Sequence, residues 1–281
     1  MAVKHAIDFA PLGELGEPAT IVRLAVAAEE SGWDGLSIWD STGASMGLAA
    51  PDPFVTLAAV AGATSRLRLI ASVIALPRRR PQLIAQAAAT LDRLSNGRLT
   101  LGLGSGGDPG DFEPFGESYE RAPRVAMLDE GVPLVDAFLR GERVQHGGPA
   151  YEVRGVGIGP ACVQQPRPPM WLGGMRPGAL RRAAQWDGWI CIGVSDDGTG
   201  MKLDPAGVQD MVVRLHAQRV ELERADAPFD VAVFGYSEPD QPGFVPSFAE
   251  AGATWWLESL SLMRGSLAEL LERIADGPPT R

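Results

Sequence analysis

The sequence has few of the residues that build disulfide frameworks, metal sites and lysine-based active sites. Its 281 residues include two cysteines and three histidines, and lysine occurs only at Lys4 and Lys202. Cys162 and Cys191 lie far apart and in no C-x-x-C pair, so we expect two reduced thiols. The histidines lack metal-ligand spacing, so we predict no metal site. No G-x-S-x-G elbow is present either, which argues against a serine hydrolase.

Long apolar runs and an excess of basic charge are also missing. No apolar run reaches the roughly 18 residues of a membrane span, and the N-terminal apolar stretch is too short for a signal peptide. The net charge is −10, from 25 basic and 35 acidic residues, which argues against a nucleic-acid partner. We therefore expect a cytoplasmic protein that acts on a small molecule.

The chain does contain a repeated alternation of short apolar strands and amphipathic helices. The predicted strands are 5–11, 35–40, 67–76, 99–104, 170–174, 189–194, 230–236 and 254–260. Eight strand–helix units favour a closed parallel barrel, so we predict a single (β/α)8 TIM-barrel domain over residues 1–281. The Gly- and Pro-rich stretch 141–169, with a small hairpin around YEVRG, is an insertion between the fourth and fifth barrel strands.

One glycine motif resembles a dinucleotide-binding fingerprint. LGLGSGG (101–107) has the spacing G-x-G-x-x-G. A Rossmann turn needs a helix directly after the glycines, but DPGDFEPFGE (108–117) contains two prolines that oppose one. We therefore interpret Gly102 and Gly104 as strand glycines against which a neighbour or a ligand packs. In a barrel, Ser105, Gly106 and Gly107 would then lie on the active face.

Three other strand exits carry candidate site residues. Asp40 follows the second strand and is either a catalytic acid or a loop cap. PRRRP (77–81) follows the third and is either a solvated turn or a site for a phosphate or an acidic cofactor tail. Gly173 and Gly174, with Arg176, precede a helix and are either a phosphate site or an ordinary turn.

Four stretches carry a family resemblance: EESGWDGLSIWD, DPFVTLAAVAGATSRLRLIASVIALPRRRP, ATLDRLSNGRLTLGLGSGG and PMWLGGMRPGALRRAAQWDGW. In them the chain resembles the luciferase-like monooxygenases, which are flavin- or F420-dependent barrel oxidoreductases. The resemblance implies FMN or F420 at the C-terminal face of the barrel, and a possible homodimer.

The resemblance also implies roles for individual residues. A non-proline cis peptide that supports the flavin ring maps to Ala71, Ser72 and Val73, with the Ser72–Val73 bond as the expected one. Ser105, Gly106 and Gly107 would approach the ring. The turn of Gly173, Gly174, Met175 and Arg176 would approach the ribityl phosphate.

Two positions depart from F420-dependent sugar-phosphate dehydrogenases of this family. Ser41 replaces a histidine and Gly107 replaces an acid, so Asp40 is the remaining acid–base candidate, with Ser41 to orient substrate or ring. We favour F420-dependent hydride transfer over FMN-dependent monooxygenation, since PRRRP suits an acidic-tailed cofactor. A non-catalytic flavin- or deazaflavin-binding protein is the alternative.

Overall fold

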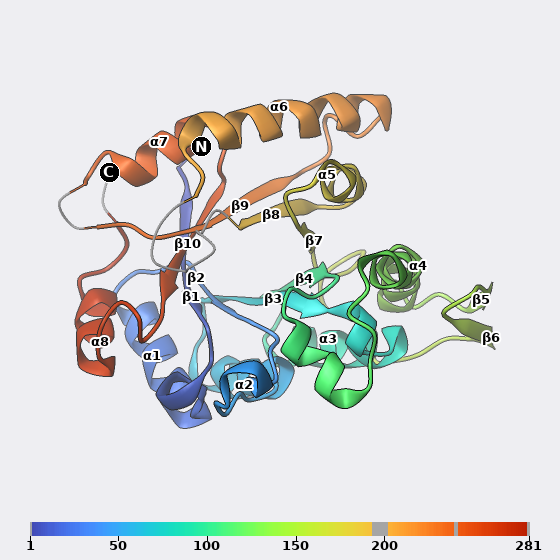
Figure 1. Cartoon of the computed structure of the whole chain (residues 1–281), viewed down its shortest axis with the longest axis horizontal. Helices are drawn as coiled ribbons and strands as arrows, with labels where there is room; N and C mark the ends of the chain where they lie inside the picture. The colour runs from blue at the N-terminus through green and yellow to red at the C-terminus, as the bar shows by residue number, and fades with distance from the viewer. Residues whose placement is uncertain (1, 193–201, 239–240, 280–281) are drawn as a thin grey trace.

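The strands of the protein close into a parallel barrel surrounded by helices (Figure 1). The computed structural model describes residues 2–192, 202–238 and 241–279. Around the barrel the strand order is β1-β10-β9-β8-β7-β4-β3-β2, and every neighbouring pair runs parallel. This confirms the predicted (β/α)8 barrel.

The bounds of the elements agree with the sequence prediction to within a few residues. The barrel strands are β1 (Lys4–Phe9), β2 (Gly35–Ile38), β3 (Arg68–Ala75), β4 (Leu99–Gly104), β7 (Met170–Gly173), β8 (Gly188–Ile192), β9 (Asp230–Gly235) and β10 (Trp255–Leu260). The helices are α1 (Pro18–Glu30), α2 (Pro53–Ala63), α3 (Pro81–Leu94), α4 (Arg121–Leu139), α5 (Pro177–Ala183), α6 (Pro205–Glu221), α7 (Phe244–Glu250) and α8 (Leu267–Ala275). Most of these helices begin with proline, which has no N–H to leave unpaired in a first turn.

The stretch 141–169 is an insertion that leaves the barrel. Strands β5 (Val144–Gly147) and β6 (Glu152–Val156) form an antiparallel hairpin, as predicted, and project from one end of the molecule in Figure 1. Asp92 of α3, which is fully buried, anchors the return of the insertion. Its carboxylate accepts hydrogen bonds from the backbone of Val163 and from the backbone and side chain of Gln164.

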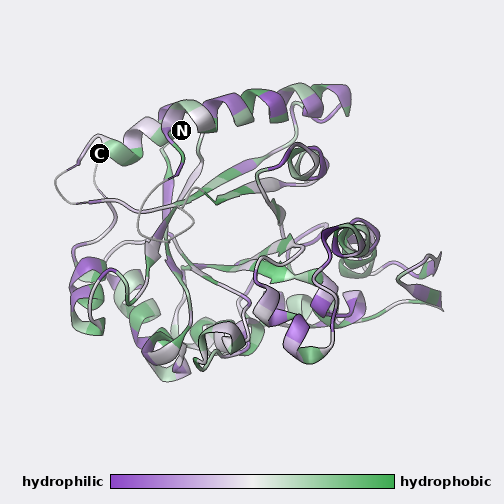
Figure 2. Cartoon of the chain, in the orientation of Figure 1, coloured by the Kyte–Doolittle hydropathy of each residue, from purple (hydrophilic) through white to green (hydrophobic). Residues whose placement is uncertain are grey.

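Apolar side chains form one core outside the barrel and another within it. The outer core lies between strands and helices, whose apolar and polar residues alternate along the ribbon in Figure 2. The inner core consists of Ala6, Ile70, Trp171, Ile190, Ala232, Phe234, Trp255 and Leu257. Trp39 and Val73 pack against this inner core. A filled interior directs any ligand to the mouth of the barrel.

Two further observations concern the cysteines and the helices. Cys162 and Cys191 are free and buried, and burial raises their thiol pKa values to about 11 and about 12. Both therefore stay protonated and unreactive at neutral pH.

Within the described residues, every helix is too short or too polar to span a lipid bilayer.

Candidate functional site

The predicted site residues all lie at the carboxyl ends of neighbouring strands. Asp40 and Ser41 follow β2, and Ala71, Ser72 and Val73 belong to β3. Ser105, Gly106 and Gly107 follow β4, while Gly173 ends β7 and Gly174, Met175 and Arg176 come next. Since β2, β3, β4 and β7 are adjacent and parallel, these segments meet at one mouth of the barrel.

Val73 is the residue around which β3, β4 and β7 come together. The Ser72–Val73 peptide bond is cis, as the family resemblance predicts. Ala71 pairs with Leu101 and Ile74 with Leu103, so a bulge at residues 72–73 shifts the register of β3 against β4. A Cβ on Gly104 would lie 2.5 Å from Val73 Cγ1, and one on Gly173 would lie 3.1 Å from Val73 Cγ2.

The strand glycines of LGLGSGG are therefore small because neighbours pack on them, which confirms that interpretation. A Cβ on Gly102 would lie 2.8 Å from Ile190 Cδ1 and 3.0 Å from the carbonyl oxygen of Ala71. Only short 3-10 turns, η4 (Pro109–Asp111) and η5 (Glu113–Phe115), follow the glycines before α4 begins. The helix that a Rossmann site requires is absent from this described segment.

The turn after β4 is fixed by a residue that the sequence prediction missed. Arg124 of α4, which is 6% exposed, donates hydrogen bonds to the carbonyl oxygens of Ser105 (2.6 Å) and Gly106 (2.7 Å). Its guanidinium stacks over Tyr119, 3.9 Å from the ring centroid, and the Tyr119 hydroxyl donates to the Gly107 carbonyl at 2.6 Å. The turn is held rigid by contacts from its outer side, which leaves its inner side free for the mouth.

Asp40 is bound by the arginines that follow β3. Its carboxylate is 2% exposed and lies 3.0 Å from Arg78 Nη2 and 2.7 Å from Arg79 Nη2. It also accepts a hydrogen bond from the backbone N–H of Ala75 at 3.0 Å. Two guanidinium groups and a backbone N–H thus occupy this carboxylate. This geometry favours a positioning role for Asp40 over the acid–base role that the sequence predicts.

Ser41 lies in a loop that is tied to the loop after β4. Its hydroxyl lies 3.3 Å from Asp111 Oδ1, and the same oxygen accepts from the backbone N–H (2.7 Å) and the hydroxyl (2.6 Å) of Thr42. Ser45 hydrogen-bonds to Asp108. Asp108 and Asp111 thus join the exits of β2 and β4 into one rim.

The turn after β7 is ordered by the neighbouring strand. The N–H of Gly174 donates to the Ile190 carbonyl at 3.3 Å, and Trp189 Nε1 donates to the Gly174 carbonyl at 2.8 Å. Arg176 is exposed and stands at the N-cap of α5. The Gly174 N–H is therefore already engaged, while Arg176 faces solvent at this rim.

Asp8 of β1 is a second residue that the sequence prediction missed. It lies two positions after Ala6, so its side chain points into the barrel, near the carboxyl end of β1. Asp8 is 1% exposed, and its Oδ2 accepts a hydrogen bond from Trp39 Nε1 at 2.6 Å. Burial raises the pKa of Asp8 to about 7, although the hydrogen bond from Trp39 lowers it.

The sequence feature that could have identified Asp8 is an acidic residue within the apolar strand HAIDF, on the same strand face as Ala6. Within the described residues no lysine, arginine or histidine forms an ion pair with Asp8. Buried carboxyls with perturbed pKa values cluster at functional sites. The inner wall of the mouth therefore carries a group that can hold or release a proton near neutral pH.

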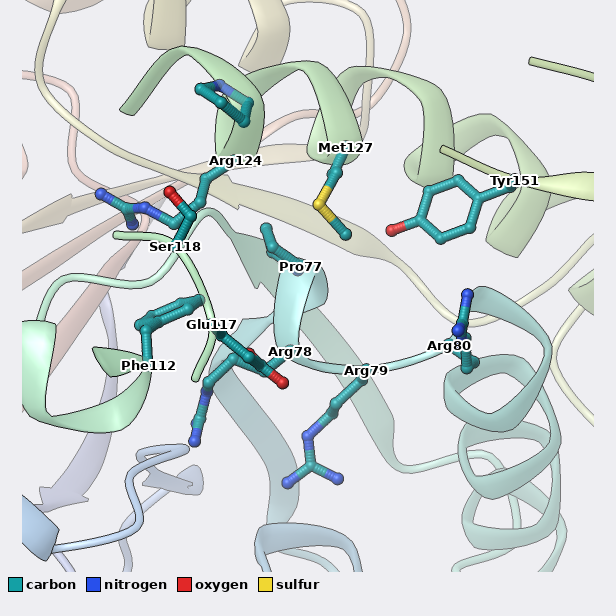
Figure 3. A pocket seen from close by; sticks show the side chains of 11 residues that line it. Pro77, Arg78, Arg79, Arg80, Phe112, Glu117, Ser118, Arg124, Met127 and Tyr151 are labelled. Carbon is teal, nitrogen blue, oxygen red and sulfur yellow. The ribbon is translucent and has the colours of Figure 1, made fainter. Parts of the chain in front are cut away.

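A cavity of about 340 Å³ lies on the outer side of the turn after β4 (Figure 3). It is lined by Pro77, Arg78, Arg79, Arg80, Phe112, Glu117, Ser118, Pro123, Arg124, Met127 and Tyr151. Four arginines and one glutamate line it, and among the described residues no carboxylate pairs with Arg80 or Arg124. Because Arg124 contacts both this cavity and the Ser105–Gly106 carbonyls, the cavity adjoins the mouth.

Comparisons with known proteins agree with this geometry. A curated relative, an uncharacterized protein of Mycobacterium tuberculosis, is 32% identical over 182 residues, which are 65% of this chain and 58% of the relative. The monooxygenase RslO1 from Streptomyces bottropensis has a TM-score of 0.82 and 19% identity, over 97% of this chain and 96% of that one. An F420-dependent secondary alcohol dehydrogenase has a TM-score of 0.79 and 15% identity, over 99% of both chains.

The sequence profile of the luciferase-like monooxygenases matches residues 2–236, which is most of the chain. The match covers β1 to β9 and all the predicted site residues. The solved structures share the barrel over nearly their whole length. The chain belongs to the luciferase-like monooxygenase family of flavin- or F420-dependent oxidoreductases.

Proposed function

We propose that this protein is an F420-dependent oxidoreductase that moves a hydride between the deazaflavin and a small organic substrate. The observation that carries the proposal is the mouth itself, where the half-buried Val73 packs on Gly104 and Gly173 beside the Ser105–Gly107 turn. Val73 covers both glycines, so a flat ring would lie against the Val73 side chain. A Cβ on Gly107 would have no atom within 4 Å, so space is open on that side.

The residues present fit such a cofactor. Val73 and the Ser105–Gly107 turn would hold the ring, and Met175 and Arg176, with the glycines before them, would hold its phosphate. The arginine-lined cavity beyond Arg124 suits the acidic tail of F420 better than it suits FMN, which has none. When bound, the deazaflavin supplies the hydride donor or acceptor.

Asp8 is the protein group proposed to handle the proton. Hydride transfer at a carbon that bears oxygen requires a proton to move at that oxygen. A carboxyl with a pKa near 7 can donate or accept it at neutral pH. The Trp39 indole, which donates to Asp8, orients the carboxyl within the apolar interior. Asp40 instead positions the Arg78–Arg79 turn behind Val73.

The similarity to an F420-dependent secondary alcohol dehydrogenase supports alcohols as the first substrates to test. The purified protein would be mixed anaerobically with F420 and a panel of small alcohols. We expect loss of the visible band of oxidised F420, and its return when a ketone is added. No change with any alcohol, aldehyde or ketone would argue against hydride transfer.

FMN-dependent monooxygenation is a second candidate, favoured by the similarity to RslO1 over nearly the full length of both chains. It predicts that the protein binds reduced FMN and consumes oxygen only when substrate is present. Oxygen uptake with reduced FMN, together with no binding of F420, would favour this candidate over the first.

A further inference from the structure

The three arginines after β3 do not point the same way. Arg78 and Arg79 are held by Asp40, and Arg79 also lies 3.0 Å from Asp52. Arg80 is exposed, and its side chain is directed to the opposite side of the turn, toward Tyr151 (Figure 3). Among the described residues no carboxylate pairs with Arg80. Its charge is therefore available to a ligand.

Tyr151 presents a buried hydroxyl to the same place. The residue is 6% exposed, lines the cavity of about 340 Å³, and points its hydroxyl between Met127 and Arg80 in Figure 3. Within the described part of the chain this hydroxyl has no hydrogen-bond partner. An unmade hydrogen bond on a buried polar group costs stability, so a ligand that accepts this bond would recover it.

Helix α3 begins at the same point. Arg80 is its N-cap residue, and no side chain caps this end of the helix. Its first residue, Pro81, has no N–H, and the next, Gln82, lines a second cavity of about 110 Å³ that shares Arg80 and Tyr151 with the first. The N–H groups of Leu83 and Ile84 donate to the Arg80 carbonyl, so the N–H of Gln82 is the one that this helix start offers to an anion.

Glu130 and Glu152, the acidic side chains near Tyr151, already have hydrogen-bond or ion-pair partners. Glu130 accepts hydrogen bonds from the backbone N–H groups of Ala150 and Tyr151 and lies 2.9 Å from His146 Nε2. Glu152 lies 2.9 Å from Arg154 Nε. Glu117 lines the larger cavity near Arg78, away from Tyr151 in Figure 3. Arg80 is therefore the basic side chain of this corner that has no carboxylate partner among the described residues.

We propose that Arg80, the Tyr151 hydroxyl and the first turn of α3 form a carboxylate-binding subsite for the acidic tail of F420. The subsite rests on the proposed function, because the cofactor would have to lie at the adjoining mouth. The larger cavity extends from Arg124, which holds the Ser105–Gly106 turn at the mouth, to Tyr151. Two donors and a helix start match the oxygens of a glutamate side chain.

The test compares the affinities of two deazaflavins, F420 with its oligoglutamate tail and the riboflavin-like precursor without a tail. Equilibrium titrations would use the full chain and three variants: Arg80→Gln, Tyr151→Phe and, as a control, Arg93→Gln. Arg93 is exposed in the last turn of α3 and lines neither cavity.

We expect the parent protein to bind the tailed form roughly tenfold more tightly, since charged hydrogen bonds are worth at least that factor. Arg80→Gln and Tyr151→Phe should each remove most of this difference and leave the affinity for the tail-less form unchanged. Arg93→Gln should keep the difference in affinity. Tyr151→Phe should also leave the melting temperature of the cofactor-free protein unchanged or higher, because the hydroxyl that it removes is unpaired.

Equal affinity of the parent for the two deazaflavins would overturn the subsite while the proposed function stands. Binding of neither deazaflavin would overturn the proposed function. A second titration, with free oligo-γ-glutamate, then tests the subsite independently of the cofactor. Binding that Arg80→Gln abolishes would support a carboxylate subsite that serves a free anion, and absence of binding would overturn it.

Discussion

At the residue scale, Asp8 is a buried carboxyl whose charge state controls both stability and the proposed chemistry. Its pKa is raised from 3.8 to about 7, so the unfolded chain releases this proton at a lower pH than the folded protein. Between about pH 4 and pH 7 the Asp8 contribution to folding free energy is therefore lost as pH rises, by at most about 1.4 kcal/mol per pH unit.

Replacement Asp8→Asn removes this titration. We predict that the variant gains stability relative to the parent as pH rises from 5 to 7, by on the order of 1–2 kcal/mol. Urea unfolding curves at both pH values measure the difference. A stability difference that does not change with pH would show that the Asp8 carboxyl already ionises at its solution pKa.

The same replacement tests the proposed proton transfer. With the cofactor bound, kcat/KM of the parent should follow a group that titrates near pH 7, and Asp8→Asn should lower the rate and remove that dependence. Retention of the pH dependence by Asp8→Asn would assign the proton to another residue.

Asp40 is predicted to contribute through its ion pairs. Asp40→Ala leaves Arg78, whose side chain is 9% exposed, without its closest carboxylate, so we expect a loss of about 3–5 kcal/mol in unfolding free energy. Ser41→Ala, which loses a long hydrogen bond to Asp111 and one from the Gly43 N–H, should cost about 1–2 kcal/mol. An Asp40→Ala variant that is as stable as the parent but inactive would restore the acid–base role predicted from the sequence.

At the scale of elements, the junction of β3, β4 and β7 depends on glycine. Gly104→Ala would place a Cβ 2.5 Å from Val73 Cγ1, so we predict a loss of about 1–3 kcal/mol. Gly107→Ala is the matched control, since no atom lies within 4 Å of its Cβ. Chemical denaturation distinguishes the two. If Gly104→Ala and Gly107→Ala were equally stable, Val73 would not be confined as described.

The elements themselves were predictable because each has a local signal. Alternating apolar strands and helices predict the barrel, and YEVRG predicts the hairpin of the insertion. Arg124 was not predictable. In RAPRVAML it resembles a solvated helix residue, and its burial depends on carbonyl groups of a turn about twenty positions earlier.

The site residues likewise divide into those that the sequence could predict and those that it could not. Val73, Gly104 and Gly173 could be placed at one mouth because parallel strands share their carboxyl ends. The ion pairs of Asp40 and the isolation of Asp8 depend on which side chains meet across the barrel, which strand order alone does not give. The sequence therefore located the mouth and offered Asp40 as its acid–base candidate, whereas we propose Asp8 for that role.

At the scale of the whole molecule, the barrel mouth is the proposed binding site for F420, and the cavity lined by arginines lies beside it. The most direct measurement is a pair of equilibrium titrations of the purified, cofactor-free chain with F420 and with FMN, at the same pH and ionic strength. We expect saturable binding of F420 at one site per chain and weaker binding of FMN. Tighter binding of FMN, or no binding of F420, would contradict it.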